Sequence, residues 1–191
     1  MPRLPRAGRT EVVELLTARV RVDGLRAEDA EALFACRGDP VVARYQGWSP
    51  PDLAAARDFI DAQPRGSSYG WFQCAIRLRE SGLLIGDLGV CLPSDPRGSV
   101  EFGVSIASPY QGRGYASETL RALFDFAFGQ LGRHRVHASV DPRNLASMAM
   151  LRALGMRQEA HHRESLWLRN EWVDDMIFAL LDHEWRSLGP R

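Results

Sequence analysis

The feature that most constrains this chain is a glycine turn that reads Gln111-Gly112-Arg113-Gly114-Tyr115-Ala116. A strand-like run over residues 100–106 precedes the turn, and an amphipathic run with helical spacing follows it up to residue 127. The order is therefore strand, glycine turn, helix. Glycines let the main chain adopt positive φ and let a ligand approach closely. Because a helix N-terminus also offers unpaired N–H groups, this arrangement is suited to binding phosphate.

The sequence excludes two other nucleotide-binding loops at this turn. No Gly-Lys-Ser/Thr follows the glycines, as the Walker loop requires, and the G-x-G-x-x-G of the dinucleotide fingerprint is absent. The glycine spacing alone leaves open a second interpretation, in which the segment is a tight strand–helix turn that binds nothing.

The glycine turn resembles the Q/R-x-x-G-x-G/A signature of the GNAT acyltransferase superfamily, the general-control-related N-acetyltransferases. The resemblance implies that the loop and helix start cradle the pyrophosphate of acetyl-coenzyme A, with Gln111, Gly112, Arg113, Gly114, Tyr115 and Ala116 as the cofactor-binding residues. It also implies that strand 100–106 splays from the next strand, so that free main-chain groups near Val104 and Ile106 bind the pantetheine arm.

A second stretch resembles the same superfamily. Residues 140–148 read Val-Asp-Pro-Arg-Asn-Leu-Ala-Ser-Met and are followed by Leu-Gly-Met at 154–156, which is similar to the N-x-x-S and L-G-F/M pattern. The resemblance implies that Asn144 holds the pantetheine amide and that Ser147 contacts the sulfur and donates a proton. A second interpretation of Ser147 stays open, in which it is a small packing residue bonded to its own backbone. Tyr115 is a weaker alternative for the proton donor.

Less distinctive segments refine the branch. Residues 16–30, the run at 39–42 and the tripeptide at 48–50 are similar to RimJ/RimL-type proteins of the superfamily. This branch implies that the acceptor is a primary amine, either a protein N-terminus or a small molecule such as an aminoglycoside-like antibiotic.

The expected fold is α/β (α+β), a single GNAT-type domain over residues 16–191 with an N-terminal extension over residues 1–15. A length of 191 residues suits one domain. Alternating and amphipathic patterns predict strands at 18–22, 70–77, 83–92, 100–106, 134–140, 157–168 and 172–181, and helices at 27–34, 53–62, 145–154 and 182–188. A short helical turn is predicted within residues 10–16. The resemblance adds a mixed, mainly antiparallel twisted sheet, flanked by helices, with splayed central strands.

The catalytic candidate on the organising strand is Glu101. Phe102, Val104 and Ile106 share the face that should point to the core, while Glu101 and Gly103 share the other. Acyl transfer to an amine needs a neutral nitrogen, and an α-amino group titrates near ~7.7–8, whereas lysine titrates near ~10.4. Glu101 is therefore the predicted base, directly or through water. A carboxylate that binds the acceptor's ammonium, or one in a structural ion pair, stays open. Main-chain N–H groups near Val104 are the predicted oxyanion donors.

Two aromatic residues are candidates for binding the acceptor. Tyr45 and Trp48 lie in a Gly/Pro-rich connection, and flat rings bind substrate area with little loss of entropy. The alternative is that both rings seal the helices onto the sheet.

Charge and composition exclude several classes of function. Basic and acidic residues balance at 24 each, so no global field favours nucleic acid or an anionic membrane. No apolar run approaches the roughly 20 residues of a membrane span. Adjacent histidines at 161 and 162 point to opposite strand faces, so no metal site is expected. Three separated cysteines and the lack of a signal-peptide core favour the cytoplasm.

The sequence therefore predicts an N-acetyltransferase that moves an acetyl group from acetyl-CoA to a protein N-terminal or small-molecule amine. Two alternatives stay open: a catalytically silent acyl-CoA-binding module, and an acyltransferase with a longer donor such as succinyl-CoA. The oligomeric state is not decided by the sequence, and a homodimer is among the states left open.

Overall fold

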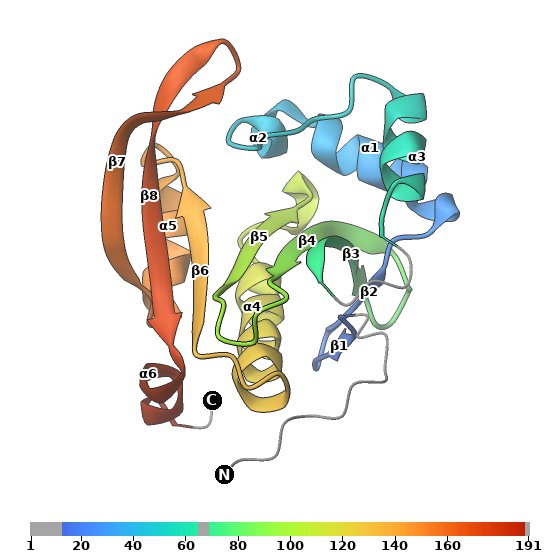
Figure 1. The fold of residues 1–191 in the computed structure, drawn as a ribbon. Helices are drawn as coiled ribbons and strands as arrows, with labels where there is room; N and C mark the ends of the chain where they lie inside the picture. The colour runs from blue at the N-terminus through green and yellow to red at the C-terminus, as the bar shows by residue number, and fades with distance from the viewer. Residues whose placement is uncertain (1–12, 65–68, 190–191) are drawn as a thin grey trace.

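The computed structural model describes residues 13–64 and 69–189. Eight strands form one sheet in the order β1-β2-β3-β4-β5-β6-β8-β7 (Figure 1). The strands are β1 (Leu15–Leu16), β2 (Val20–Gly24), β3 (Gly70–Leu78), β4 (Leu84–Leu92), β5 (Val100–Ile106), β6 (Arg135–Val140), β7 (Arg157–Leu168) and β8 (Glu171–Leu181). Every neighbouring pair is antiparallel except β5 and β6, which are parallel. The predicted mixed, mainly antiparallel sheet flanked by helices is confirmed.

The helices are short and lie on both faces of the sheet. They are α1 (Ala30–Gly38), α2 (Pro40–Ala43), α3 (Leu53–Asp61), α4 (Tyr115–Asp125), α5 (Leu145–Ala153) and α6 (Asp182–Ser187). Short 3-10 turns lie at Ala27–Asp29 and Ser108–Tyr110, and a π-helical turn at Phe126–Gln130 extends α4. No helix in the described part of the chain is both long and apolar enough to cross a bilayer.

The N-terminal region departs most from the predicted elements. The strand predicted at 18–22 begins at Val20, because Thr17 and Val20 close a turn in which the Val20 main-chain N–H donates to Thr17 Oγ1 at 3.0 Å. The predicted helical turn within 10–16 is wrong at its end, since Leu15–Leu16 is a strand, and residues 10–12 lie outside the described residues. Val13 and Leu15 are buried in the core, so the last residues of the predicted extension pack with the domain.

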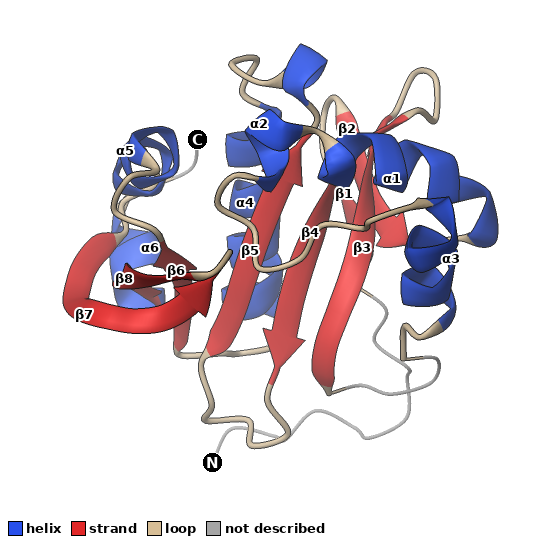
Figure 2. Ribbon diagram, turned by 90° about the horizontal axis from the view of Figure 1, so that it is seen from above, coloured by secondary structure: helices blue, strands red, loops and turns tan. Residues whose placement is uncertain are grey.

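One face of the sheet packs on α4 (Figure 2). Alternation along β5 puts Val100 and Phe102 into this core, where the Phe102 ring meets Phe124 of α4 edge-on at 5.4 Å. Glu101 and Gly103 point to the other face, as the sequence predicts. The glycine turn is therefore held between a buried strand and a helix whose apolar face is buried against that strand.

The opposite face of the sheet is covered by α1 and α3 and contains buried ion pairs. Arg37 of α1 donates from Nε to Asp87 Oδ2 of β4 at 2.8 Å. Arg77 of β3 holds Asp23 and Asp29, with contacts of 2.6–2.7 Å. These pairs fix the segment that runs from α1 to α2 relative to the sheet.

The parallel pair β5 and β6 separates along its length. The two strands pair only through Val100 with Val136 and Glu101 with His137. Beyond these residues they diverge, and α2 and the β7–β8 hairpin lie on the two sides of the opening (Figure 1). The splayed central strands implied by the family resemblance are confirmed.

Candidate functional site

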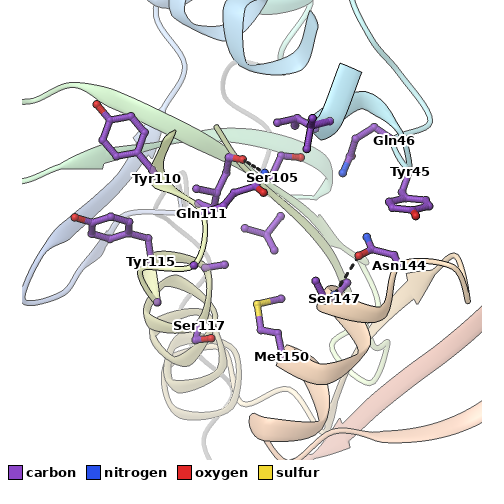
Figure 3. Close-up of a pocket in the computed structure, with 18 residues that line it drawn as sticks. Tyr45, Gln46, Ser105, Tyr110, Gln111, Tyr115, Ser117, Asn144, Ser147 and Met150 are labelled. Atoms are coloured by element: carbon purple, nitrogen blue, oxygen red, sulfur yellow. Dashed lines mark hydrogen bonds between the residues drawn. The ribbon is translucent and has the colours of Figure 1, made fainter. Parts of the chain in front are cut away.

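A cavity of about 530 Å³ lies at the opening between β5 and the helices that flank it (Figure 3). Its lining comes from the α2 region, the end of β5, the glycine loop, the start of α4 and the start of α5. A smaller cavity of about 110 Å³ continues between β5 and β6. The residues common to both cavities are Tyr45, Gln46, Val104, Asn144, Ser147 and Met150.

The glycine loop presents its main chain to the larger cavity. Gly112 and Gly114 have φ of 71° and 82°, values that glycine adopts without strain. The main-chain N–H groups of residues 112–117 make no hydrogen bond to any other described residue. Gly112, Gly114 and the first residues of α4 line the cavity. Free amides at the positive end of a helix form an anion site. The space beside Gly112 is open, since a Cβ placed there would meet no atom within 4 Å.

Contacts to the β1–β2 turn hold this loop in place. Arg19 Nη1 donates to the Arg113 carbonyl at 3.0 Å, and its Nε donates to Glu118 at 2.6 Å. Thr17 donates to the same carboxylate at 2.6 Å. Although burial by itself raises the pKa of Glu118, hydrogen bonds from Thr17 and Arg19 outweigh it and hold this pKa below its ordinary value. The Arg113 side chain lies over the Tyr110 ring, outside the cavity lining.

The end of β5 offers fewer free groups than predicted. Val104 and Ile106 line the larger cavity, but Gln111 Nε2 already donates to the Ile106 carbonyl at 2.8 Å. Gln111 thus braces the loop against β5. The Tyr115 ring lies under the Arg19 guanidinium at 4.7 Å, and its phenol points away from Ser147 (Figure 3). This geometry does not favour Tyr115 as a proton donor near Ser147.

The start of α5 places two predicted residues in both cavities. Asn144 is the N-cap of α5, and its Oδ1 accepts from the Ser147 main-chain N–H at 3.1 Å (Figure 3). The Asn144 amide nitrogen makes no hydrogen bond to a described residue. Met150 joins them one turn further along, a contact that the sequence reasoning missed although the spacing of three from Ser147 indicates it.

The two aromatic candidates lie in different places. Tyr45 lines both cavities, and its hydroxyl donates to the Arg143 carbonyl at 3.1 Å. Trp48 stacks on Phe59 of α3 at 4.2 Å and is not part of either lining. Trp48 thus has the geometry of the alternative interpretation, in which the ring seals a helix. Gln46, which the sequence reasoning did not single out, lines both cavities beside Tyr45.

Glu101 lies at the point where β5 and β6 separate, outside both cavity linings. Its carboxylate is 3.8 Å from Nε2 of His137, its partner across the parallel pair. Burial lowers the pKa of His137, and the nearby Glu101 charge opposes that shift. Gly103 leaves open space on the same face of β5. The sequence reasoning missed His137, because only the register of two distant strands brings it to Glu101.

A further polar pair adjoins the smaller cavity. Ser139 of β6 lines this cavity and donates to Asp175 of β8 at 2.6 Å. Asp175 is only 7% exposed. From the sequence, the acidic pair Asp174 and Asp175 was expected either to shape the acceptor mouth or to belong to a charged hairpin turn. The sequence reasoning missed Ser139, for which the only hint was a polar residue at an alternate position in the predicted strand 134–140.

The arrangement fits a long anionic ligand with a reactive end. Its diphosphate would meet the free amides of the glycine loop, and its other end would reach the splay between β5 and β6. Among the described residues no group of three His, Cys, Asp or Glu side chains gathers to hold a metal ion.

Comparisons with known proteins agree with this geometry. The family model described as an acetyltransferase (GNAT) domain matches residues 19–157. The uncharacterized N-acetyltransferase p20 of Bacillus licheniformis is 29% identical over 90% of this chain and 97% of its own length. The [ribosomal protein uS5]-alanine N-acetyltransferase of Escherichia coli is 30% identical over 44% of this chain and 43% of its own. Mycobacterium smegmatis RimJ in complex with CoA-disulfide superposes with a TM-score of 0.76 at 21% identity, covering 93% of this chain and 94% of that one.

Proposed function

Since the chain belongs to the GNAT acetyltransferase family, we propose that it transfers an acetyl group from acetyl-CoA to a primary amine. The observation that carries the proposal is the row of unbonded amides at residues 112–117, which opens into a cavity leading to the splay of β5 and β6. The reaction needs an anion site for the cofactor and an opening for the amine, and the two adjoining cavities provide one at each end.

The residues divide the work of binding. Gly112, Gly114 and Ala116 offer amides to the diphosphate, and Gln111 keeps the loop against β5. Asn144 has its amide nitrogen free to hold a pantetheine carbonyl. When bound, acetyl-CoA supplies an acyl group activated as a thioester.

The residues near the splay serve the chemistry. A main-chain N–H near Val104 stabilises negative charge on the acyl oxygen, because a preorganised donor in a partly closed site needs no reorganisation. Ser147, which lines both cavities, donates a proton toward the sulfur. Glu101 faces the acceptor side, where it binds the ammonium or takes its proton through water. Tyr45 closes the acceptor side of the cavity.

The acceptor is proposed to be a protein N-terminal α-amine or a small-molecule amine. The relative from Escherichia coli is named for an alanine of a ribosomal protein, which supports an α-amine. An α-amino group is partly neutral near pH 7.7–8, so it needs less help from a base than lysine does. Residues 16–191 are proposed as the catalytic domain, with residues 1–15 as an extension, and the cytoplasm as the location.

The test measures free-thiol release from acetyl-CoA with three amines: a peptide with a free N-terminal alanine, spermidine and kanamycin. Turnover that depends on an amine is expected. CoA at about a hundred times its Kd should also stabilise the protein by about 2.7 kcal/mol. A melting temperature unmoved by saturating CoA would remove the proposal.

A catalytically silent acyl-CoA-binding module is the second candidate, and the position of Glu101 outside both cavities favours it. This module would be stabilised by CoA and would release no thiol with any amine. Running the same assay with succinyl-CoA separates a longer-donor acyltransferase from an acetyltransferase.

A further inference from the structure

We propose that Ser139 and Asp175 form a proton relay that accepts the proton of the acceptor amine. This inference rests on the proposed function and identifies the group that acts as base. It leaves Glu101 the role of binding the acceptor's ammonium.

The first observation is where Ser139 lies. Ser139 lines the smaller cavity, as do Asn144 and Ser147. Those two residues are the ones assigned to the pantetheine and sulfur end of the cofactor. Ser139 is exposed, so its hydroxyl oxygen is open to an acceptor that enters between β5 and β6. Glu101, by contrast, is outside this lining.

The second observation is how Asp175 is bonded. Four aspartates are buried in the described part of the chain, and three of them are held by a guanidinium: Asp87 by Arg37, and Asp23 and Asp29 by Arg77. Asp175 has no such cation, and the hydroxyl of Ser139 is its one hydrogen-bond donor among the described residues. A buried carboxylate normally requires a cationic or multiple hydrogen-bonding partner. Among the buried aspartates of the described residues, Asp175 is therefore the one that no guanidinium neutralises.

The third observation is the direction of the hydrogen bond. A carboxylate only accepts, so the hydroxyl of Ser139 donates its proton to Asp175 Oδ1, at 2.6 Å. The remaining lone pairs of Ser139 Oγ are therefore free to accept from an amine N–H in the cavity. The hydroxyl thus connects Asp175, which lines neither cavity, to a nitrogen in the smaller cavity.

The proton transfers balance. The acceptor's ammonium, bound by Glu101, first releases one proton to solvent, so that the attacking nitrogen is neutral. As this nitrogen bonds to the acyl carbon, one of its N–H protons passes to Ser139 Oγ while the Ser139 proton passes to Asp175 Oδ1. The C–S bond then breaks, and its electron pair leaves with sulfur, which takes a proton from solvent, directly or through Ser147. Asp175 returns its proton to solvent through Ser139. From the neutral amine onward the net change moves one proton from nitrogen to sulfur, and no oxidant, reductant or metal is needed.

The test compares four variants with the amine that the wild type turns over fastest among the alanine peptide, spermidine and kanamycin. Ser139→Ala removes the relay hydroxyl and leaves the buried Asp175 without its hydrogen-bond donor, so its melting curve is recorded beside its rate. Ser139→Thr keeps a hydroxyl there. Asp175→Asn keeps an acceptor for Ser139 and removes the charge. Asp174→Asn is the matched control, since Asp174 is the adjacent residue on β8, points to the opposite face and binds His161.

Ser139→Ala and Asp175→Asn should each lower kcat by roughly 10²-fold, the lower range of general-base effects. The variant that carries both Ser139→Ala and Asp175→Asn should have a kcat no lower than that of the slower single variant, because the two groups act as one unit. Ser139→Thr should restore most of the rate, and Asp174→Asn should stay within twofold of wild type. Glu101→Gln should mainly raise the KM for the amine.

A readout other than turnover separates proton transfer from binding. Calorimetry with the protein saturated with CoA should give the same amine affinity for Ser139→Ala as for wild type, and a weaker affinity for Glu101→Gln. Unchanged kcat in both Ser139→Ala and Asp175→Asn would overturn the relay while leaving the acetyltransferase intact. A wild type that turns over none of the three amines would instead remove the proposed function, and the relay with it.

Discussion

The two halves of the site are built in different ways. The half that we propose for the cofactor is a contiguous stretch, residues 112–117, and the groups that it offers belong to the main chain. The half that we propose for the acceptor combines Tyr45, Ser139 and Asp175, which come from the α2 region, β6 and β8. The difference teaches that a main-chain site is encoded by local conformation, whereas a side-chain site depends on how distant elements are fastened together.

The fastening differs as well. The cofactor loop is tied to the β1–β2 turn by Arg19, a side chain that is 48% exposed, through Glu118. The segment that carries Tyr45 follows α1, and α1 is tied to the sheet by Arg37 and the fully buried Asp87. Loss of a buried charge partner costs more than loss of an exposed one. Four predictions test this contrast, beginning with the largest effect.

Asp87→Ala should destabilise the whole protein, because it leaves Arg37 buried without its carboxylate and frees Gln73, which also donates to Asp87. Removing one partner of a buried pair costs about 3–5 kcal/mol. For a chain of this size the melting temperature should fall by roughly 6–20 °C. Asp95→Ala, which breaks an exposed pair with Arg97, is the control and should leave it unchanged. A fall under 2 °C for Asp87→Ala would contradict the contrast.

Gly114→Ala should weaken the cofactor half while leaving the acceptor half in place. Gly114 has φ of 82°, and a side chain there costs roughly 1–2 kcal/mol and would lie 3.4 Å from Arg19 Nη2. We expect at least a tenfold loss of CoA affinity by calorimetry. Gly129→Ala is the control, because Gly129 has ordinary φ and nothing within 4 Å. Equal CoA affinity in both variants would argue against a role for the loop conformation.

Asn144→Asp should separate the capping role of this residue from its role toward the cofactor. Aspartate keeps the oxygen that accepts from the Ser147 N–H, so the melting temperature should change by about 1 °C or less. The lost amide nitrogen should reduce CoA affinity roughly tenfold, the upper range for one hydrogen bond. Asn144→Ala, which removes both groups, should lower stability by about 1 kcal/mol as well. If Asn144→Asp binds CoA with the affinity of the wild type, Asn144 caps helix α5 and does not contact the cofactor.

Glu118→Gln should give the smallest effect, visible as a change in pH dependence. The pKa of Glu118 is lowered on folding, so its charge contributes stability above its ordinary value of 4.5, and this is lost as the pH falls through the lower folded value. The variant should therefore melt below wild type at pH 7, and the gap should close in acid. Melting curves from pH 7 to 3.5 measure this gap, with exposed Glu80→Gln as the control. A gap that is independent of pH would show that the charge is not responsible.

Much of the fold was readable from local patterns. Strand 100–106, the glycine turn and the helix that follows were predicted at their observed positions, because alternation and glycine conformation act within a few residues. The two strands of the last hairpin were also predicted, at 157–168 and 172–181, and Arg169 and Asn170 form the turn between them with φ of 52° and 64°. The prediction was weakest at the N-terminus, where pairing with β2 made Leu15–Leu16 a strand.

The candidate site was readable only in part. Most of the predicted glycine-loop residues, Asn144 and Ser147 line the cavity, whereas Arg113 does not, and their role toward a cofactor stays a prediction. These positions were readable because each is determined by the conformation of its own segment. The sequence also proposed Trp48, whose ring stacks on Phe59 instead. No local pattern could have shown that contact, because the two rings belong to separate segments.

The sequence by itself determined that a strand, a glycine turn and a helix would leave main-chain amides free for an anion, because φ preference and helix geometry are local properties. Only the tertiary structure decided which carboxylate stands behind the acceptor opening. Ser139 and Asp175 are 36 residues apart, and the register of β6 on β8 alone places one hydroxyl against one buried charge.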